Sequence, residues 1–546
     1  MKALVAGPLA LALLAPTAAS LDTSAVGVGQ ICRAEQIYAP NKGPRKLDFL
    51  PGIGSGGFPA RTSSVQAQRW FDFGVQLYHA FYHADARLAF DKAVAADADC
   101  ALCRWGQALS RGPTQNFDME AADAKTALDM ARQALKLAKS DEERSLAQAL
   151  VARYQAKQTP LTEETFAAAL IRAVAKDPSK LDIRLIAAEA LLTADRRGDH
   201  AVAPRARDML LPILKAQPDN TAAIHYYIHA TEAAGDPVDA LPYAERLAGL
   251  APGASHLIHM AAHTYIHAGR YEDVAALNAR ALEVDAAHAR ATDAPGALGS
   301  PDYYPHNLSF GLAGAMMAGD GPLAVKFADD ARVAFPPGGR ENMGYMTARV
   351  MAAYGRYAPG RALSLAEPKG SDNQALAMWR YARGEALASK GDAKAVLGES
   401  QRIGQVIEQW KKAKSDQQNG LTEARIAQRV LEGRADMLEG RPADAAKAFS
   451  AAADLQAKAK WGMDPPPWWY PVRRSLAAAD LKAGRNADAV LQATASLGGW
   501  PADALALEVR ALAELKLGQA EKSRTDAAAA RAAWHGDPAK VPIDLI

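Results

Sequence analysis

The sequence predicts an all-α protein in which helical hairpins stack into a superhelical solenoid. Alanine and leucine dominate long segments whose apolar residues stand three and four positions apart, and alternating β-branched residues are scarce. At 546 residues the chain is longer than one hydrophobic core usually serves. Regularly placed glycines divide it into similar units. An array of repeats, each packed on its neighbours, accounts for all three observations.

A unit of about 34 residues recurs along the chain. In its clearest copy Tyr265 precedes a turn at Gly269, Tyr271 opens the second helix, and small side chains follow. The same turn returns at Gly235 and Gly440, and weaker copies end their first helices near Gly319, Gly355, Gly391, Gly484 and Gly518. This pattern resembles the tetratricopeptide repeat (TPR), which implies a solenoid, and roughly eight to eleven hairpins of about 34 residues fit the length of the chain.

The start of the chain is typical of a signal peptide. Met1 and Lys2 precede an apolar run, and small residues fill the end of segment 1–20, where we expect cleavage. Residues 21–60 are rich in glycine and proline and form an extension or loop. TPR-like arrays follow at 61–335, with the histidine-rich groove, and at 336–546. We expect a periplasmic or secreted protein with no transmembrane segment after signal removal, and a retained signal anchor is the alternative.

Charge and cysteine content narrow the functional classes. With 63 basic and 61 acidic residues the net charge is +2, which provides no field to steer a nucleic acid. Cys100 and Cys103 suit a local disulfide, thiol exchange or metal ligation, although no βαβ pattern supports a thioredoxin-like site. The glycine-rich run at 52–57 lacks the Lys-Ser/Thr ending of a phosphate loop. No Gly-x-Ser-x-Gly elbow stands on a strand-to-helix turn, so conventional nucleophile-based hydrolysis has no supporting motif.

One histidine pair appears twice at the period of the repeat. His225 and His229 recur 34 positions later as His259 and His263. Residues one repeat apart occupy equivalent places on neighbouring helices of a solenoid. On the second of these helices His256, His259, His263 and His267 fall within a stripe of about 80°. The TPR resemblance places this face of the first helices along the concave groove.

Facing imidazoles on neighbouring helices suit a transition-metal ion. Packed helices run about 8–10 Å apart, a gap that two such rings close onto one ion. Imidazole suits zinc, copper, iron or nickel, and a catalytic site uses three protein ligands with one open position. The candidate ligands are His225, His229, His256, His259, His263 and His306, with copper or zinc the leading ions. Glu232 is the candidate catalytic carboxylate, as an acid or base beside the ion or as a further ligand.

Other residues are weaker candidates for the same groove. His79, His83 and His267 are less favoured as ligands, since His83 stands where the TPR pattern has a packing aromatic. Tyr303, Tyr304, Trp468, Trp469 and Arg473 are candidate groove residues, although tryptophans at hairpin starts more often anchor packing. The alternative for the whole histidine set is a polar groove lining that contacts a peptide or takes part in helix packing.

Segments 77–83, 100–106, 225–229, 256–263 and 303–307 resemble those of exported bacterial TPR proteins with a histidine-rich central region. We therefore weigh two functions. The first is a solenoid with a transition-metal site that acts on a small substrate as a metal-dependent oxidoreductase or hydrolase. The second is a TPR scaffold that holds a peptide or a partner protein without metal.

Overall fold

The computed structural model describes residues 46–155, 160–195, 201–293, 303–334, 344–369, 372–412, 418–459, 461 and 465–546. The predicted signal peptide and residues 21–45 lie outside this part of the chain. The described residues form helices and contain no strand, which confirms the all-α prediction. No helix among them is both long and apolar enough to cross a membrane.

The helices follow one another in pairs. The first twelve are α1 (Val65–His79), α2 (His83–Ala96), α3 (Ala101–Leu109), α4 (Asp123–Leu137), α5 (Asp141–Gln155), α6 (Pro160–Lys176), α7 (Leu181–Ala194), α8 (Ala203–Ala216), α9 (Thr221–Ala234), α10 (Leu241–Leu250), α11 (Ser255–His267) and α12 (Tyr271–Ala291). The others are α13 (Tyr304–Ala318), α14 (Gly321–Ala334), α15 (Gly344–Tyr357), α16 (Pro359–Ser364), α17 (Asn373–Ala388), α18 (Ala393–Lys412), α19 (Gln418–Leu438), α20 (Pro442–Lys458), α21 (Arg473–Lys482), α22 (Asn486–Gly499), α23 (Ala504–Lys516) and α24 (Ala520–Ala532).

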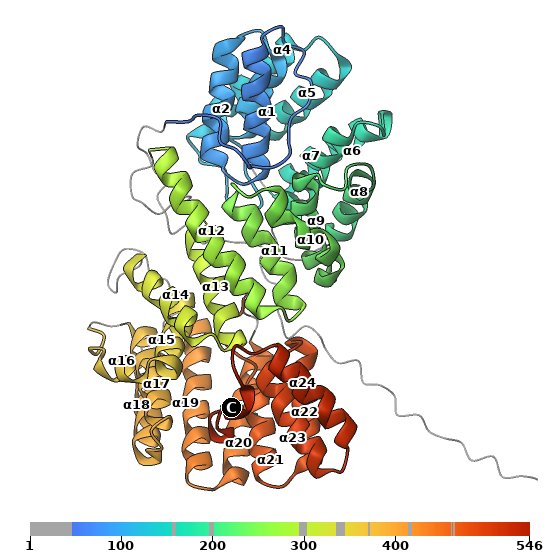
Figure 1. Ribbon diagram of the computed structural model, residues 1–546. Helices are drawn as coiled ribbons and strands as arrows, with labels where there is room; N and C mark the ends of the chain where they lie inside the picture. Colours follow the sequence, from blue (N-terminus) through green and yellow to red (C-terminus); the bar gives the residue numbers. More distant parts are fainter. Residues whose placement is uncertain are drawn as a thin grey trace, which may run out of the picture.

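These pairs build the TPR-like solenoid that the repeat pattern predicts. Figure 1 shows the hairpins as a curved array that runs from α1 and α2, through α11 to α13 in the middle, to α24. The 24 helices of the described residues make twelve pairs, one more than the upper end of the predicted range. The predicted boundary between two arrays, after residue 335, lies outside the described residues.

Glycine turns set the geometry of the hairpins. Gly269 takes φ +73°, a left-handed conformation that residues with a Cβ adopt only at a cost. The next residue, Arg270, donates its N–H to the carbonyl of Tyr265 at 2.9 Å and closes the end of α11. Gly235 ends α9 in the same conformation. The first helices of successive hairpins, α9, α11 and α13, consequently contact one another.

The segment before α1 ties the N-terminal hairpin to these central helices. Gly253 donates its N–H to the carbonyl of Gly52 at 2.8 Å, and Ser55 donates its N–H to the hydroxyl of Thr221 at 2.6 Å. In addition, α1 contacts α9 directly. Residues far apart in the sequence therefore meet at the first turn of α9 and of α11.

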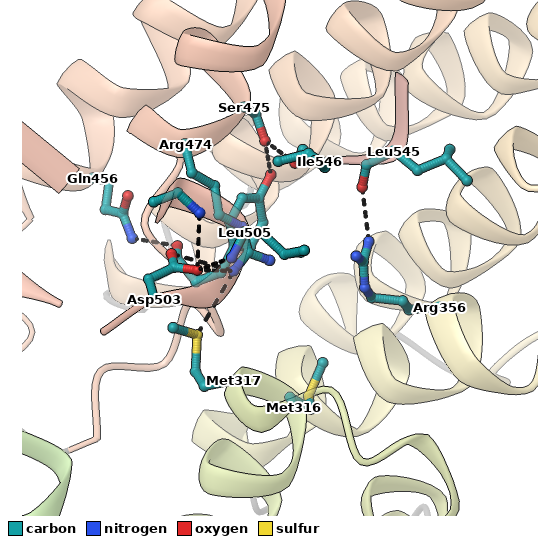
Figure 2. Close-up of polar contacts among 12 residues, drawn as sticks. Met316, Met317, Arg356, Gln456, Arg474, Ser475, Asp503, Leu505, Leu545 and Ile546 are labelled. Atoms are coloured by element: carbon teal, nitrogen blue, oxygen red, sulfur yellow. Dashed lines mark hydrogen bonds and ion pairs between the residues drawn. The ribbon is translucent and has the colours of Figure 1, made fainter. Parts of the chain in front are cut away.

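The C-terminal hairpins close back onto α13. Arg474 pairs with Asp503 at 3.1 Å, and its Nη1 lies 3.9 Å from the sulfur of Met317 on α13 (Figure 2). Ser475 donates its hydroxyl to the terminal carbonyl of Ile546 at 2.5 Å (Figure 2). These buried contacts hold the end of the chain against the centre of the solenoid.

Candidate metal centre

Six histidines on α9, α11 and α13 form two groups of three. Triad 1 consists of His225, His229 and His256, and triad 2 consists of His259, His263 and His306. Within each triad, ring nitrogens of all three residues lie within 4.8 Å of one another. The six residues singled out as candidate ligands in the sequence are the six that the solenoid brings together. The histidine pair of each triad comes from one helix, and the third histidine comes from the next first helix.

Triad 1 is centred on His225. Its Nε2 lies 3.1 Å from Nε2 of His229 and 3.1 Å from Nε2 of His256. Its Nδ1 lies 2.7 Å from the backbone carbonyl oxygen of His79. A carbonyl oxygen only accepts, so Nδ1 carries the proton and Nε2 of the neutral ring presents a bare lone pair to the other two imidazoles.

Asn278 on α12 fixes the tautomer of His259 in triad 2. The amide nitrogen of Asn278 donates to the carbonyl of Val274 at 2.8 Å, which turns the amide oxygen toward His259. That oxygen lies 2.7 Å from Nδ1 of His259 and accepts its proton. Nε2 of neutral His259 is consequently bare as well.

His263 is the centre of triad 2. Its Nδ1 lies 3.0 Å from a carboxylate oxygen of Glu232, and its Nε2 lies 3.0 Å from Nε2 of His259 and 3.4 Å from Nε2 of His306. In the neutral form of His263, with Nδ1–H donated to the carboxylate, two lone pairs face each other across the His259–His263 contact. A second proton, on Nε2 of His263, would remove the repulsion toward only one of the two neighbouring rings. A metal cation would bind all three rings at once.

The spacing of the nitrogens suits a shared ion. Two nitrogens bound to one tetrahedral ion at about 2.0–2.1 Å lie roughly 3.3 Å apart. Separations of 3.0 to 3.4 Å between Nε2 atoms in the two triads are close to this value. Histidines that bind metal usually donate the other N–H to a carboxylate or a backbone carbonyl. Glu232, the carbonyl of His79 and the amide of Asn278 occupy such positions.

Five of the six triad histidines are buried, and His306 is part-buried. His225, His229 and His259 have no exposed surface. Burial lowers the pKa of His229 and of His306 to about 3, and it lowers the pKa of His225, His256 and His259 well below the ordinary range. Glu232 behaves differently: burial alone would raise its pKa, but the charge and hydrogen bond of His263 hold it well below the usual range. The Glu232 carboxylate next to His263 of triad 2 is therefore ionised.

The triads do not line an open groove, which corrects one expectation from the sequence. The turn between α1 and α2 covers triad 1, and α13 covers triad 2. The ring centroid of Phe81 lies 4.5 Å from that of His225 and 4.6 Å from that of His256. Phe310 similarly lies 4.4 Å from His263. Contacts between elements far apart in the sequence produce this burial, and the repeat pattern contains no information about them.

Phe81 occupies the turn position that glycine holds in neighbouring hairpins. It takes φ +62°, and the next residue, Tyr82, donates its N–H to the carbonyl of Leu77 at 2.9 Å, as Arg270 does after Gly269. A left-handed conformation costs a residue with a Cβ roughly 1–2 kcal/mol. This strain is located where the phenyl ring packs on triad 1, as backbone strain often is at functional sites.

The less favoured histidines lie around the triads. His79 supplies the carbonyl that His225 uses, and its Nδ1 lies 3.0 Å from the hydroxyl of Tyr226. His83 packs against Phe81 and contributes no ring nitrogen to either triad. His267 lies 3.8 Å from Glu232, beside the carboxylate. The N-terminal hairpin thus meets the central histidines mainly through its backbone and Phe81.

The aromatic candidates divide between the site and the core. Tyr303 packs on His256 with ring centroids 4.4 Å apart. Trp468 and Trp469 are buried in the C-terminal hairpins, where Trp469 donates its indole N–H to the hydroxyl of Tyr381 at 3.1 Å. They anchor packing, as tryptophans at hairpin starts usually do.

The last two groove candidates, Tyr304 and Arg473, are not members of either triad. Burial raises the pKa of the half-buried Tyr304 to about 12, so its hydroxyl keeps its proton. Arg473 bonds to Gln492 at 2.8 Å.

Sequence reasoning missed several residues of the site. The absence of a glycine at the end of the first hairpin's leading helix is the signal that could have identified Phe81. A buried pair of His288 and Asp85, 2.6 Å apart and stacked on Tyr82, was also missed. Cys100 and Cys103, left open by the sequence, form a disulfide at the start of α3.

Comparisons with known proteins return only distant structural likenesses. No protein-family model matches the chain, and a search of curated proteins finds no match. Among solved structures, the Cut9–Hcn1 hetero-tetramer of the APC/C has 11% identity and a TM-score of 0.29, covering 83% of this chain and 78% of that one. The TPR domain of P58(IPK) has 14% identity and a TM-score of 0.22, covering 84% and 99%. A human IFIT1 dimer with m7Gppp-AAAA has 14% identity and a TM-score of 0.28, covering 86% and 90%. These likenesses carry no argument about this chain's function.

Proposed function

We propose that this chain is an exported solenoid protein whose buried histidines bind a transition-metal ion, copper or zinc, and use it on a small substrate. One observation carries the proposal. In triad 2, Nε2 of His263 lies 3.0 Å from Nε2 of His259 and 3.4 Å from Nε2 of His306, while Nδ1 of His259 and Nδ1 of His263 each face an oxygen. A cation at this point would be bound by all three imidazoles.

The ligand set favours a reactive ion over a structural one. Structural zinc sites are closed by four protein ligands, whereas catalytic sites keep three ligands and an open position. Each triad offers three imidazoles. A bound ion there would polarise a substrate or activate water, and copper would also transfer electrons. Glu232, hydrogen-bonded to His263, would orient that ring and take up charge changes at the ion.

A pocket separated from triad 1 by His79 offers room for a small substrate. Its volume is about 370 Å³, and its lining includes Gly56, Val75, His79, Ile186 and Asn220. His79, which lines this pocket, is also the residue whose backbone carbonyl accepts a hydrogen bond from Nδ1 of His225. Export is supported by the signal-like start of the sequence and by the disulfide between Cys100 and Cys103, since disulfides persist in oxidising compartments.

Metal analysis of protein purified without a histidine tag tests the proposal. We expect copper or zinc in the protein as isolated, or restored after removal with a chelator and addition of either ion. Replacing both His225 and His263 with alanine should abolish the bound metal. Protein that holds neither ion and cannot be reconstituted would contradict the proposal and leave a TPR scaffold for a peptide or partner protein as the better account.

A further inference from the structure

Resting on the proposed metal binding, we infer that the two triads form a dinuclear copper centre, with one ion in each triad and the pair close enough to bind one molecule of dioxygen between them. The observation behind this inference is the juxtaposition of two complete three-imidazole sets that share no residue.

The six rings do not converge on one point. Each group whose nitrogens lie within 4.8 Å contains three histidines, and neither group includes a member of the other. The close Nε2 contacts likewise run within the triads, from His225 to its two partners and from His263 to its two partners. One ion therefore cannot take all six nitrogens, and two ions satisfy both sets.

The two sets are direct neighbours. His256 of triad 1 and His259 of triad 2 stand one turn apart on α11, with ring centroids separated by 5.9 Å. The centroids of His229 and His263 are 6.3 Å apart, the same distance as between His229 and His256 within triad 1. Two ions bound at the triads would therefore occupy adjacent sites, as the ions of two-metal sites do.

The charges around the triads favour copper in its monovalent state. One carboxylate, Glu232, is hydrogen-bonded to a triad imidazole. The positive charge of the buried Arg349 guanidinium helps to lower the pKa of His306. Two divalent ions would add four positive charges to this buried region, whereas two Cu(I) ions add two. Because the cost of burying charge rises steeply with its magnitude, the all-imidazole pair suits Cu(I) better than two zinc ions.

Such a pair is a two-electron donor in a closed site. Dioxygen binding between the ions takes one electron from each Cu(I), leaving two Cu(II) ions and dioxygen reduced by two electrons to the peroxide level. No proton is consumed and no bond to the protein forms. The phenyl rings of Phe81 and Phe310 pack on opposite triads and exclude large ligands from the rings, so a small neutral molecule fits this site best.

Copper stoichiometry of matched variants tests the pair. Untagged protein is loaded with Cu(I) under anaerobic conditions, freed of excess ion by desalting, and analysed for copper per chain. We expect two ions in the wild type, one in His229→Gln, one in His306→Gln and none in the double variant. His83→Gln, which changes a histidine outside both triads, should keep two.

The results separate this inference from the proposed function. One copper per chain in the wild type, lost in both single variants, would overturn the dinuclear centre and leave metal binding intact. A wild type that binds neither copper nor zinc would overturn both. Circular dichroism shows whether each variant has the helical content of the wild type, and a misfolded variant is replaced by the asparagine variant at the same position.

Oxygen uptake tests the pairing of the ions. The reduced wild type should take up one dioxygen per two coppers and afterwards give no electron paramagnetic resonance signal, because adjacent Cu(II) spins couple. Each single variant, oxidised chemically, should give the signal of one isolated Cu(II). A signal of two uncoupled Cu(II) ions in the oxidised wild type, or no oxygen uptake by protein holding two Cu(I) ions, would overturn the inference.

Discussion

Triads 1 and 2 have the same three-imidazole composition and different surroundings. In triad 1 the backbone carbonyl of His79 orients His225, and Nδ1 of His229 and of His256 has no hydrogen-bond partner among the described residues. In triad 2 an amide and a carboxylate orient His259 and His263. A carboxylate that accepts the second ring N–H raises the basicity of a metal-bound imidazole. Triad 2 is therefore expected to bind its ion first and triad 1 to hold the more weakly bound one.

The difference also shows how a repeat protein can diversify one site. The pair of histidines one turn apart is copied from α9 to α11, while the groups that orient the rings come from different elements: the last residue of α1 for triad 1, and residues of α9 and α12 for triad 2. Equivalent ligands thereby acquire unequal environments.

Acidification should produce the largest effect, and it should act on both triads alike. Burial lowers the pKa of His79, His83, His229 and His306 to about 3. Below about pH 6.5 these rings take protons in the unfolded chain and stay neutral in the native one, so the metal-free protein loses stability as the pH falls from 6.5 toward 3. Between pH 6.5 and 5.5 the loss is about 1 kcal/mol for each ring, about 4 kcal/mol for the four.

Urea unfolding of the metal-free protein at pH 7.5, 6.5 and 5.5 measures this loss. The variants His229→Gln and His306→Gln should each reduce it by about 1 kcal/mol. A stability that does not change between pH 7.5 and 5.5, or a reduction in one variant alone, would show that the two triads are not equally shielded from protons.

Loss of a central ligand should separate the triads. His225→Ala and His263→Ala each remove the ring that contacts both partners of its triad. In each variant the affinity of the altered triad for its ion should fall more than about 100-fold. The other triad should keep its ion. Competition titration with a chelator measures the remaining site. Loss of both ions in either variant would mean that the two sites bind cooperatively.

Replacing Glu232, whose carboxylate bonds to His263 of triad 2, should reduce metal affinity less than replacing a histidine ligand does. Glu232→Gln retains an oxygen that can accept from Nδ1 of His263 and removes the charge. We expect the affinity of triad 2 for its ion to fall about 10–100-fold, with triad 1 unchanged. Glu245→Gln, at an exposed residue, is the matched control. Equal effects on the two triads would contradict the assignment of Glu232 to triad 2.

The two phenylalanines should respond differently to the same substitution. Glycine removes a packed ring at both positions. At position 81 glycine also relieves the left-handed backbone strain, which stabilises the protein by about 1 kcal/mol. At position 310 glycine lowers the stability of the helix by about 1 kcal/mol. Phe310→Gly should therefore destabilise the metal-free protein by about 2 kcal/mol more than Phe81→Gly does. Thermal unfolding compares the two, and equal losses would show that Phe81 carries no strain.

Much of the fold could be predicted because its determinants are local. Apolar spacing predicts helices, and glycines such as Gly269 mark the turns at which the left-handed backbone needs no Cβ. The second histidine pair was recognisable for the same reason, since the repeat period aligns His259 with His225 on successive first helices. The predicted range of hairpins fell one short of the twelve in the described residues, and α16, with six residues, is too short for apolar spacing to identify as a helix.

By itself the sequence determined the helices, the turns and the register that brings the histidine pairs onto neighbouring first helices. Only the tertiary structure decided that His256 completes one triad and His306 the other, that Phe81 and Phe310 bury them, and that Glu232 and Asn278 orient the rings. The physical reason is that helix formation depends on neighbours along the chain. Burial and hydrogen-bond partners depend instead on the accumulated rotation of many stacked hairpins, which brings residue 81 against residue 225.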